Sequence, residues 1–287
     1  MKIGVVGSIN VDLIYQLDRP LAQGETRFAS SYEVLDGGKG ANQAVMTKAL
    51  YQNTVFLGAV GPDTFGQKAL KSLKEKALDD DVVSVKGDTG LAVIQLLTGD
   101  NQIVVFPGAN HLLTPSHVDA FLAKHPDLGW LVVQLESPMD TVVYLLEKAH
   151  LKGIKTILNP APAPQNFKLE WLAWVDYLVP NEHEMVAIFG DDAFETILEK
   201  YPKKVLVTLG KDGVKFFDQR LIHVPAEVIK VVDTTGAGDS FVAGFTVALA
   251  QEESLYAAVE HGIKVASLTC QRMGAQGAYN ELKGKTK

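Results

Sequence analysis

The sequence is poor in cysteine and has no long apolar run. Its one cysteine, Cys270, excludes an internal disulfide and a cysteine-based zinc site, and a lone thiol fits a reducing compartment. The apolar run at the N-terminus ends at Ser8, which is too short for the core of a signal peptide, and no other run approaches the roughly 20 apolar residues of a membrane span. We therefore expect a cytoplasmic protein with no membrane partner.

Basic charge is also scarce. The chain has 27 Lys and Arg residues against 34 Asp and Glu residues, which gives a net charge of -7 and a pI near 5.5. Proteins that bind nucleic acid need a basic surface to displace counterions from the phosphates, so we do not expect a nucleic-acid partner. No internal repeat or low-complexity linker divides the 287 residues, of which 47% are hydrophobic. This length and composition suit one large α/β domain or two smaller ones.

Short apolar runs alternate with segments of helical length along most of the chain. The runs are interpreted as buried strands, because strands of a parallel sheet that is covered on both faces are almost continuously hydrophobic. They are KIGVVGS, TVFLGAVG, WLVVQLE, KTILNPA, DYLVPN and KVLVTLG. The predicted helices cover 39–51, 64–77, 138–152, 182–189, about 237–251 and about 253–271. This order predicts a mostly parallel central sheet between two layers of helices, a three-layer α/β/α fold.

Three regions depart from this alternation. Residues 11–34 and 91–106 have strand-like composition and contain no helical segment. We interpret them as a small antiparallel sheet that could serve as a lid or an oligomer interface, although an ordinary extension of the main sheet fits the pattern equally well. The segment GVKFFDQRLIHVPAEVIKVVD, residues 213–233, predicts a β meander.

Polar and glycine-rich clusters follow several predicted strands. Ligands of open α/β sheets bind beyond the carboxyl ends of the strands, so these clusters are candidate binding residues. Any one cluster could be an ordinary turn or helix cap, but their recurrence at one sheet edge favours a site. The clusters contain Asn10 and Asp12; Gly37, Gly38, Lys39, Gly40 and Asn42; Glu136; Asn181 and Glu184; and the segment TLGKDG after KVLV.

Two common phosphate-binding motifs do not match. The Walker loop has a glycine five residues before its Gly-Lys pair and a Ser or Thr after it, but Glu33 and Gly40 occupy those positions around Lys39. The dinucleotide-binding fingerprint fails because Phe241 stands where GAGDSF should carry its third glycine. The sequence therefore supports neither a P-loop nor a Rossmann site.

The segment VVDTTGAGDSF, residues 231–241, indicates an anion site of another kind. A glycine-rich turn that leads into a helix leaves backbone N–H groups unpaired at the positive end of the helix dipole. The small residues Gly236, Ala237 and Gly238 leave those groups accessible, and Asp239 lies in the first turn, where the dipole favours its ionised form. A simple helix cap would explain Asp239 but not the two glycines. We therefore predict an anion hole for a phosphoryl group, with Asp239 as the base that accepts the proton of an attacking hydroxyl.

Eight motifs occur in the order found in the PfkB family of carbohydrate kinases: GSINVD, GGKGANQAV, QLESP, LNPAPA, PNEHE, VTLGKDG, DTTGAGDSF and GAQ. The chain resembles the ribokinase branch of that family over nearly its whole length. The resemblance implies a ribokinase-like fold, with a mostly parallel sheet between helices and a small β lid over the sugar. It also implies a single kinase domain over residues 1–287, with lid strands drawn from about 11–34 and 91–106.

The resemblance implies ATP-dependent phosphorylation of D-ribose at its 5-hydroxyl, by in-line phosphoryl transfer. A kinase for 2-deoxyribose or another small sugar is an alternative within the same class. A sugar or nucleotide sensor that has the fold but no catalysis is an alternative of another class, because fold alone does not fix function. The intact base and glycines favour an enzyme over a sensor.

The resemblance also assigns site residues. Those implied for the sugar are Asn10, Asp12, Gly38, Lys39, Asn42, Ala92, Ile94, Glu136 and Asp239, with Ala92 and Ile94 as an apolar wall in the lid. Those implied for the nucleotide are Asn181, Thr208, Gly210, Lys211, Gly213, Gly238 and Ile263. The anion hole would be formed by Gly236, Ala237 and Gly238, next to the base Asp239.

Metal ions and a second subunit are implied in the same way. Mg²⁺ would arrive with ATP and lie near Glu184 through water, and potassium or another monovalent cation would be held by two loops beside the anion hole. The residues that match those loops are Asp233, Thr235, Thr269, Arg272 and Gly274. Ile263 and Ala278 stand where the family often has polar side chains, near adenine and in the cation loop respectively. The resemblance further implies a homodimer formed through the lid.

Overall fold

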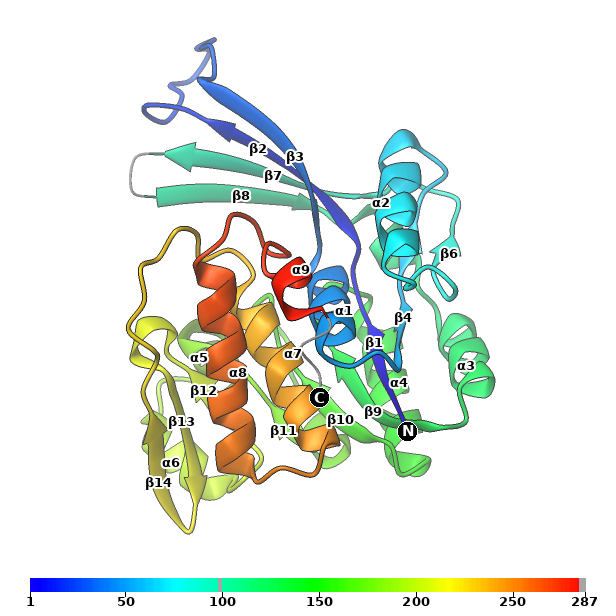
Figure 1. Ribbon diagram of the computed structural model, residues 1–287, viewed down its shortest axis with the longest axis vertical. Coiled ribbons are helices and arrows are strands. Elements are labelled where there is room, and N and C mark those ends of the chain that lie inside the picture. The colour runs from blue at the N-terminus through cyan, green and yellow to red at the C-terminus, as the bar shows by residue number, and fades with distance from the viewer. Residues whose placement is uncertain (98–99, 284–287) are drawn as a thin grey trace.

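The computed structural model describes residues 1–97 and 100–283, and its centre is a five-stranded sheet in the order β11-β10-β9-β1-β4 (Figure 1). The strands are β1 (Lys2–Val6), β4 (Thr54–Leu57), β9 (Leu128–Val133), β10 (Lys155–Leu158) and β11 (Tyr177–Leu178). Every neighbouring pair is parallel. Parallel bridges from Val205 to Leu178 and from Thr208 to Asn181 place β12 (Leu206–Thr208) next to β11. The chain then turns into the antiparallel strands β13 (Val214–Asp218) and β14 (Arg220–Val224).

Helices cover both faces of this sheet because its strands are apolar on both sides. Ile3 and Val5 of β1 join one core with α1 (Lys39–Leu50), α2 (Thr64–Glu75), α7 (Ala237–Ala250), α8 (Leu255–Cys270) and α9 (Tyr279–Leu282). Val6 joins the opposite core with α3 (Pro115–Lys124), α4 (Met139–Leu151), α5 (Glu182–Phe189) and α6 (Phe194–Lys200). Each fully buried side chain of this kind contributes about 1.5–3 kcal/mol. The predicted three-layer α/β/α fold is confirmed.

The predicted helices agree with the observed ones to within about three residues, but three helices and one loop were not anticipated. The helix predicted over 182–189 is α5, whereas α3, α6 and α9 were missed. The predicted β meander is only half correct, because β13 and β14 form a hairpin but residues 225–236 contain no strand. Val228, Val231 and Val232 of that segment are exposed, so no neighbouring strand covers them. Among the helices described, none is long and apolar enough to cross a lipid bilayer.

A second, four-stranded sheet stands over one end of the central sheet, and we call it the lid sheet (Figure 1). Its order is β3-β2-β7-β8, with β2 (Asn10–Gln16), β3 (Ser31–Gly37), β7 (Gly90–Leu97) and β8 (Asp100–Phe106). These strands come from the two segments predicted for a lid, and they do not extend the central sheet. The β2–β7 pair is parallel, so the lid sheet is mixed rather than wholly antiparallel as predicted. The short strands β5 (Ala59–Val60) and β6 (Val83–Ser84) pair with each other in a separate two-stranded sheet.

Candidate active site

The first part of the site is the tight junction between β1, β2 and the start of α1. Gly38, the residue before α1, has a φ of +90°, and a Cβ there would lie 2.6 Å from the backbone nitrogen of Asn10. A Cβ on Gly40 would lie 2.4 Å from the carbonyl carbon of Gly7. Packing alone therefore requires glycine at both positions. The close approach holds the first turn of α1, including Lys39, against the carboxyl end of β1.

Glu136 reaches this junction from the segment that follows the neighbouring strand β9. Its Oε2 accepts a hydrogen bond from the Ser8 hydroxyl and another, 3.1 Å long, from the backbone N–H of Lys39. The Ser8 hydroxyl in turn accepts from the backbone N–H of Gly40 at 3.2 Å. Sequence reasoning missed Ser8, although it stands within the quoted motif GSINVD. Ser8 fixes where the Glu136 carboxylate lies.

Asn10 is buried beside the same junction, with 4% of its surface exposed. Its Oδ1 accepts a hydrogen bond of 2.8 Å from Nδ2 of Asn110, which lies in the short helix η1 (Gly108–Leu112). Asn110 also exchanges hydrogen bonds with the backbone of Ile9. The oxygen of Asn10 is therefore engaged within the protein, and its Nδ2 is the group left to donate to a ligand. No sequence motif pointed to Asn110, because its role depends on the η1 contact with the lid strands.

Asp12 lies two residues further along β2, on the face of the lid sheet that carries Ile14, Ala92 and Ile94. In the β2–β7 register Asp12 is opposite Ala92 and Ile14 is opposite Ile94, so the alternation of strand side chains puts all four on one face. Burial, and then the negative charges of nearby acids, raises the pKa of Asp12 to about 7. Close to neutral pH this carboxyl can thus donate as well as accept a hydrogen bond.

Lys39 supplies positive charge to a group of carboxylates. Burial disfavours its charged form, but the surrounding acids outweigh burial and raise the pKa of Lys39. In order of effect the acids are Asp239, Glu136, Glu184 and Asp12. They come from four different elements of the chain, so the fold has collected one cation and four acids at the carboxyl edge of the sheet. This clustering is what the recurrence of polar residues after the strands predicted.

Asp239 is buried in the first turn of α7 and faces α1. Its Oδ2 accepts a hydrogen bond of 3.0 Å from Nδ2 of Asn42, and its Oδ1 accepts one of 2.9 Å from Nε2 of Gln43. Burial raises the pKa of Asp239, while the charge of Lys39 and the two amide donors act in the opposite direction. The carboxylate is therefore held in a fixed orientation beside residues predicted for the sugar. Sequence reasoning missed Gln43, although it follows Asn42 in GGKGANQAV.

The predicted anion hole is partly closed by the chain itself. Gly236, before α7, has a φ of +74°, and a Cβ there would lie 2.5 Å from Cβ of Ala275, so glycine is required by the backbone. The N–H of Ala237 donates to the Thr234 carbonyl at 3.2 Å. Within the described part of the chain the N–H of Gly238 finds no backbone acceptor, and a Cβ on Gly238 would meet nothing within 4 Å. Gly238 thus presents an open N–H at the positive end of α7.

The residues predicted for the nucleotide lie at the ends of β11 and β12. Asn181 caps α5 and forms a reciprocal pair with Glu184, in which each side chain accepts a hydrogen bond of 2.9 Å from the backbone N–H of the other. Asn181 Nδ2 also donates to Glu184 Oε1 at 2.9 Å. Both oxygens of Glu184 are thereby engaged, which suits contact with a metal ion through water better than direct ligation. Burial raises the pKa of Glu184.

The remaining nucleotide positions are near this pair, with one exception. Thr208 pairs with Asn181 across a parallel bridge, and Gly210 and Lys211 follow it in the exposed short helix η3 (Gly210–Asp212). Gly213 has a φ of +90° and passes close to the Val224 carbonyl, so it serves the backbone turn. Ile263 is only 7% exposed and belongs to the apolar core. Its contact with an adenine ring stays a prediction.

The two segments predicted for a monovalent cation lie side by side. Asp233 Oδ1 accepts from the backbone and hydroxyl of Thr235, at 2.9 and 2.7 Å, and its Oδ2 accepts from the backbone N–H of Gly274 at 2.8 Å. Burial acts to raise the pKa of Asp233, but these hydrogen bonds outweigh it and lower the pKa. The hydroxyl of buried Thr269 pairs with Ser240, and the exposed Arg272 pairs with Glu281. Asp233 therefore organises the two loops, which is compatible with a cation held mainly by backbone carbonyls.

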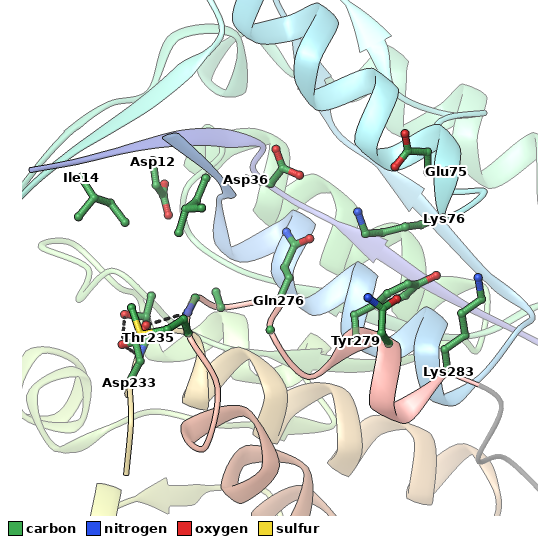
Figure 2. Close-up of a pocket in the computed structure, with 16 residues that line it drawn as sticks. Asp12, Ile14, Asp36, Glu75, Lys76, Asp233, Thr235, Gln276, Tyr279 and Lys283 are labelled. Carbon is green, nitrogen blue, oxygen red and sulfur yellow. Dashed lines mark hydrogen bonds between the residues drawn. The ribbon is translucent and has the colours of Figure 1, made fainter. Parts of the chain in front are cut away.

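A cleft of about 480 Å³ opens between the lid sheet and these loops. Figure 2 shows Asp12 and Ile14 above it, the Asp233–Thr235 loop below, and Gln276 between that loop and the Tyr279 end of the cleft. Asp12 lines this cleft but Asp239 does not, so the cleft adjoins the carboxylate group rather than containing it. Within residues 1–97 and 100–283 we find no cluster of three or more His, Cys, Asp and Glu side chains placed to hold a metal ion.

Comparison with known proteins agrees with this arrangement. A relative named ribokinase from Lactococcus lactis subsp. lactis is 40% identical over 292 residues, covering 100% of this chain and 97% of its own. A relative named deoxyribokinase from Salmonella typhi is 31% identical, covering 97% and 95%. Among solved structures, ribokinase from Thermotoga maritima is 32% identical with a TM-score of 0.89, covering 98% and 97%. Ribokinase from Arabidopsis thaliana, solved with ribose and ATP, is 30% identical with a TM-score of 0.84, covering 99% of each chain.

The family model described as pfkB family carbohydrate kinase matches residues 1–282. Its match, the ribokinase relatives and the ribokinase structures span nearly the whole chain and include the lid sheet, the carboxylate group and the start of α7. The protein is a carbohydrate kinase of the pfkB family.

Proposed function

We propose that the protein phosphorylates D-ribose at its 5-hydroxyl with ATP, giving ribose 5-phosphate and ADP, and that residues 1–287 act as one kinase domain with the lid sheet over the sugar. The observation that carries this proposal is the Asp239 carboxylate. It lies in the first turn of α7, one residue from the open N–H of Gly238, and it is hydrogen-bonded to Asn42 among the residues predicted for the sugar. A base and an anion site are thus adjacent, as phosphoryl transfer to a hydroxyl requires.

In the proposed reaction, the ribose oxygen forms a bond to the γ-phosphorus while the bond from that phosphorus to the β-phosphate oxygen breaks. Asp239 takes the proton of the hydroxyl, and the N–H of Gly238 at the positive end of α7 stabilises charge on the transferring group. The raised pKa of Asp239 brings this base closer to neutral pH. The predicted role of Ala237 in the anion hole is secondary, because its N–H already donates to the Thr234 carbonyl, whereas Gly236 keeps its proposed role.

Sugar recognition is proposed for the polar groups around Lys39, with Ala92 and Ile94 of β7 as the apolar wall. A small sugar offers hydroxyls that both donate and accept, so it needs fixed donors and acceptors around it. The proposed donors are the Nδ2 groups of Asn10 and Asn42 and the ammonium of Lys39. Glu136 and Asp12 are the acceptors. Gly38 keeps the backbone close to the sugar.

ATP with Mg²⁺ is proposed to bind along the ends of β11 and β12, against Asn181, Thr208, Gly210, Lys211 and Gly213, with Glu184 near the metal ion through water. Mg²⁺ would supply charge neutralisation of the phosphates. The Arabidopsis thaliana relative, solved with ribose and ATP, supports this pair of ligands. A monovalent cation at Asp233, Thr235, Thr269, Arg272 and Gly274 is the proposed activator. The cytoplasmic location stays a prediction.

A homodimer through the lid sheet is proposed from its exposed apolar edge. Ile103, Val104, Val105 and Phe106 of β8 are consecutive, and 46% to 70% of each side chain is exposed. A contiguous apolar strand at the edge of a sheet is a typical protein–protein contact.

The test is ADP formation across ribose, 2-deoxyribose and fructose, with and without potassium. We expect ribose to give the highest kcat/KM. Turnover of 2-deoxyribose at an equal rate would move the assignment to the activity named for the Salmonella typhi relative. Binding of ribose without ADP release would favour the sensor instead.

A further inference from the structure

The two amides that hold Asp239 are themselves held by other side-chain amides. On one side, Gln134 Nε2 donates to Gln43 Oε1 at 2.5 Å, and Gln43 Nε2 donates to Asp239 Oδ1 at 2.9 Å. On the other side, Gln276 Nε2 donates to Asn42 Oδ1 at 3.1 Å, and Asn42 Nδ2 donates to Asp239 Oδ2 at 3.0 Å. Each series of donors therefore ends on one oxygen of the same carboxylate.

The ionised form of Asp239, which is the form that acts as a base, fixes the direction of these hydrogen bonds. An ionised carboxylate only accepts, so the atom of Gln43 that faces Asp239 must be the Nε2 donor. Its Oε1 then faces Gln134, which must present its own Nε2. Reversing either amide would set two acceptors against each other.

Gln134 and Gln43 lie in the protein interior, where a buried polar group costs folding free energy unless it is hydrogen-bonded. Gln43 is 0% exposed and Gln134 is 1% exposed. Gln43 Nε2 is shared with Asn159 Oδ1 at 3.1 Å, and Asn159 Nδ2 donates to the Val179 carbonyl at 3.0 Å. A Cβ on Gly7, the residue after β1, would lie 1.9 Å from Gln134 Oε1, so glycine at this position leaves space for the amide. Apolar residues of the same size would fill this region of the core at lower cost.

We propose that Gln43, held by Gln134 and Asn159, is a positioning residue that orients the Asp239 carboxylate for proton transfer from the sugar hydroxyl. This inference rests on the proposed kinase function. A carboxylate has about four acceptor positions. The amides of Gln43 and Asn42 occupy one on each oxygen, which fixes the plane of the group and leaves the other positions for the substrate. Asn42 is proposed to touch the sugar as well, whereas Gln43 acts only through Asp239.

The charges around Asp239 explain why two amide donors are needed. Lys39 favours the ionised carboxylate and Glu136 opposes it. Asp12 and Glu184 are close enough for Asp239 to raise their pKa values. A buried carboxylate among three other acids is hard to ionise, and only the ionised form can accept a proton. Loss of the Gln43 donor therefore both frees the orientation of Asp239 and raises its pKa further.

The experiment compares wild type with Gln43→Met, which keeps the length and volume of the side chain but removes both polar atoms. A hydrogen bond to a charged group predicts a loss in kcat of about 10- to 100-fold. The KM values for ribose and ATP should stay within about twofold, because Gln43 touches neither ligand. The acidic limb of the kcat–pH profile should move to higher pH.

Thr47→Val is the matched control. Thr47 is on the same helix, is 0% exposed, and its hydroxyl has no hydrogen-bond partner among the described residues. This isosteric change should leave kcat and the pH profile unchanged. If Gln43→Met does not fold, Gln134→Met removes the donor to Gln43 without touching Asp239, and it should lower kcat in the same direction by a smaller factor.

The outcomes separate this inference from the proposed function. Folded Gln43→Met with the kcat and pH profile of wild type would overturn the positioning role alone. An equal change in kcat and KM with no movement of the acidic limb would also overturn it, since that pattern indicates a purely structural role. If wild type itself releases no ADP with any sugar, the proposed function fails and the inference fails with it.

Discussion

Gly238 offers a sharp test of the anion site, because stability and activity should respond in opposite directions to one methyl group. A Cβ at Gly238 would meet nothing within 4 Å, and the residue is exposed in the first turn of α7. Alanine fits helical backbone better than glycine, so Gly238→Ala should stabilise the protein by about 0.4–1 kcal/mol. For a domain of this size that corresponds to a rise in Tm of roughly 1–2 °C.

The same methyl group would project into the space where a phosphoryl group must approach the N–H of Gly238. Removal of one donor to a developing anion costs about 100- to 1,000-fold in kcat in other enzymes. Obstruction of the donor should cost about 100-fold, near the lower end of that range. The assay is coupled ADP formation at saturating ribose and ATP, with Tm measured on the same samples.

Gly236→Ala is the comparison variant, two residues earlier. Its φ of +74° and the 2.5 Å approach to Ala275 predict a loss of stability of about 1–3 kcal/mol together with any loss of activity. Gly238→Ala with a raised Tm and wild-type turnover would refute the reasoning, because the open end of α7 would then not receive the phosphoryl group.

Three other perturbations test separate features of the structure. The pKa of Asp12 is about 7 in the folded protein and 3.8 for an unperturbed aspartate, so the unliganded protein binds more protons than the unfolded chain between these pH values. The protein therefore loses stability as the pH rises through this range. The Tm of Asp12→Asn minus the Tm of wild type should therefore increase from pH 5 to pH 8, as measured by thermal unfolding at each pH. A Tm difference that does not change with pH would contradict the raised pKa. Asp233→Ala removes the acceptor for Thr235 and Gly274 and should cost about 1–3 kcal/mol in urea unfolding at pH 7. Because the pKa of Asp233 is lowered on folding, that cost should shrink as the pH falls below 3.8, the pKa of an unperturbed aspartate, and an unchanged cost in acid would contradict the lowered pKa. Val104→Glu places a charge on the exposed apolar edge of β8, so under the proposed homodimer it should sediment as a monomer in a velocity experiment in which wild type sediments as a dimer. A wild-type monomer would refute the proposed dimer, and a dimeric variant would exclude this edge from the interface.

The layers of the fold were predictable because they depend on local pattern. Parallel strands that are buried on both faces, such as β9, give continuous apolar runs. The helix α5 is preceded by the capping residue Asn181 and followed by Gly190, both of which are typical helix boundaries. The helix α3 was missed although its sequence contains a helical pattern, because Val118, Phe121 and Leu122 repeat with helical spacing after the capping residue Thr114. Residues 227–233, the last part of the predicted β meander, are rich in β-branched side chains, but Pro225 and the lack of a covering neighbour leave them in a loop.

The residues of the site were predictable from the sequence, but the hydrogen bonds between their side chains were not. Asp239, Lys39, Asn42 and Glu136 stand in motifs at strand ends, and the topology of a parallel sheet brings such ends together. The hydrogen bonds from Gln134 to Gln43 and from Gln43 to Asp239 join residues 91 and 196 positions apart, and only the tertiary packing of α1 against α7 and against the residue that follows β9 brings them into contact. The hydrogen bond from the Ala237 N–H to the Thr234 carbonyl likewise depends on backbone angles that the composition does not reveal.

The central claim is that the acid at the start of α7 removes the proton during phosphoryl transfer, and Asp239→Asn tests it most directly. The amide keeps the size of the side chain but cannot accept the proton, so single-turnover ADP formation with ribose should fall by about 100- to 10,000-fold. ATP affinity, measured by calorimetry on the same preparation, should stay within about twofold of wild type. A variant that binds ATP normally and turns over ribose at the wild-type rate would contradict the account.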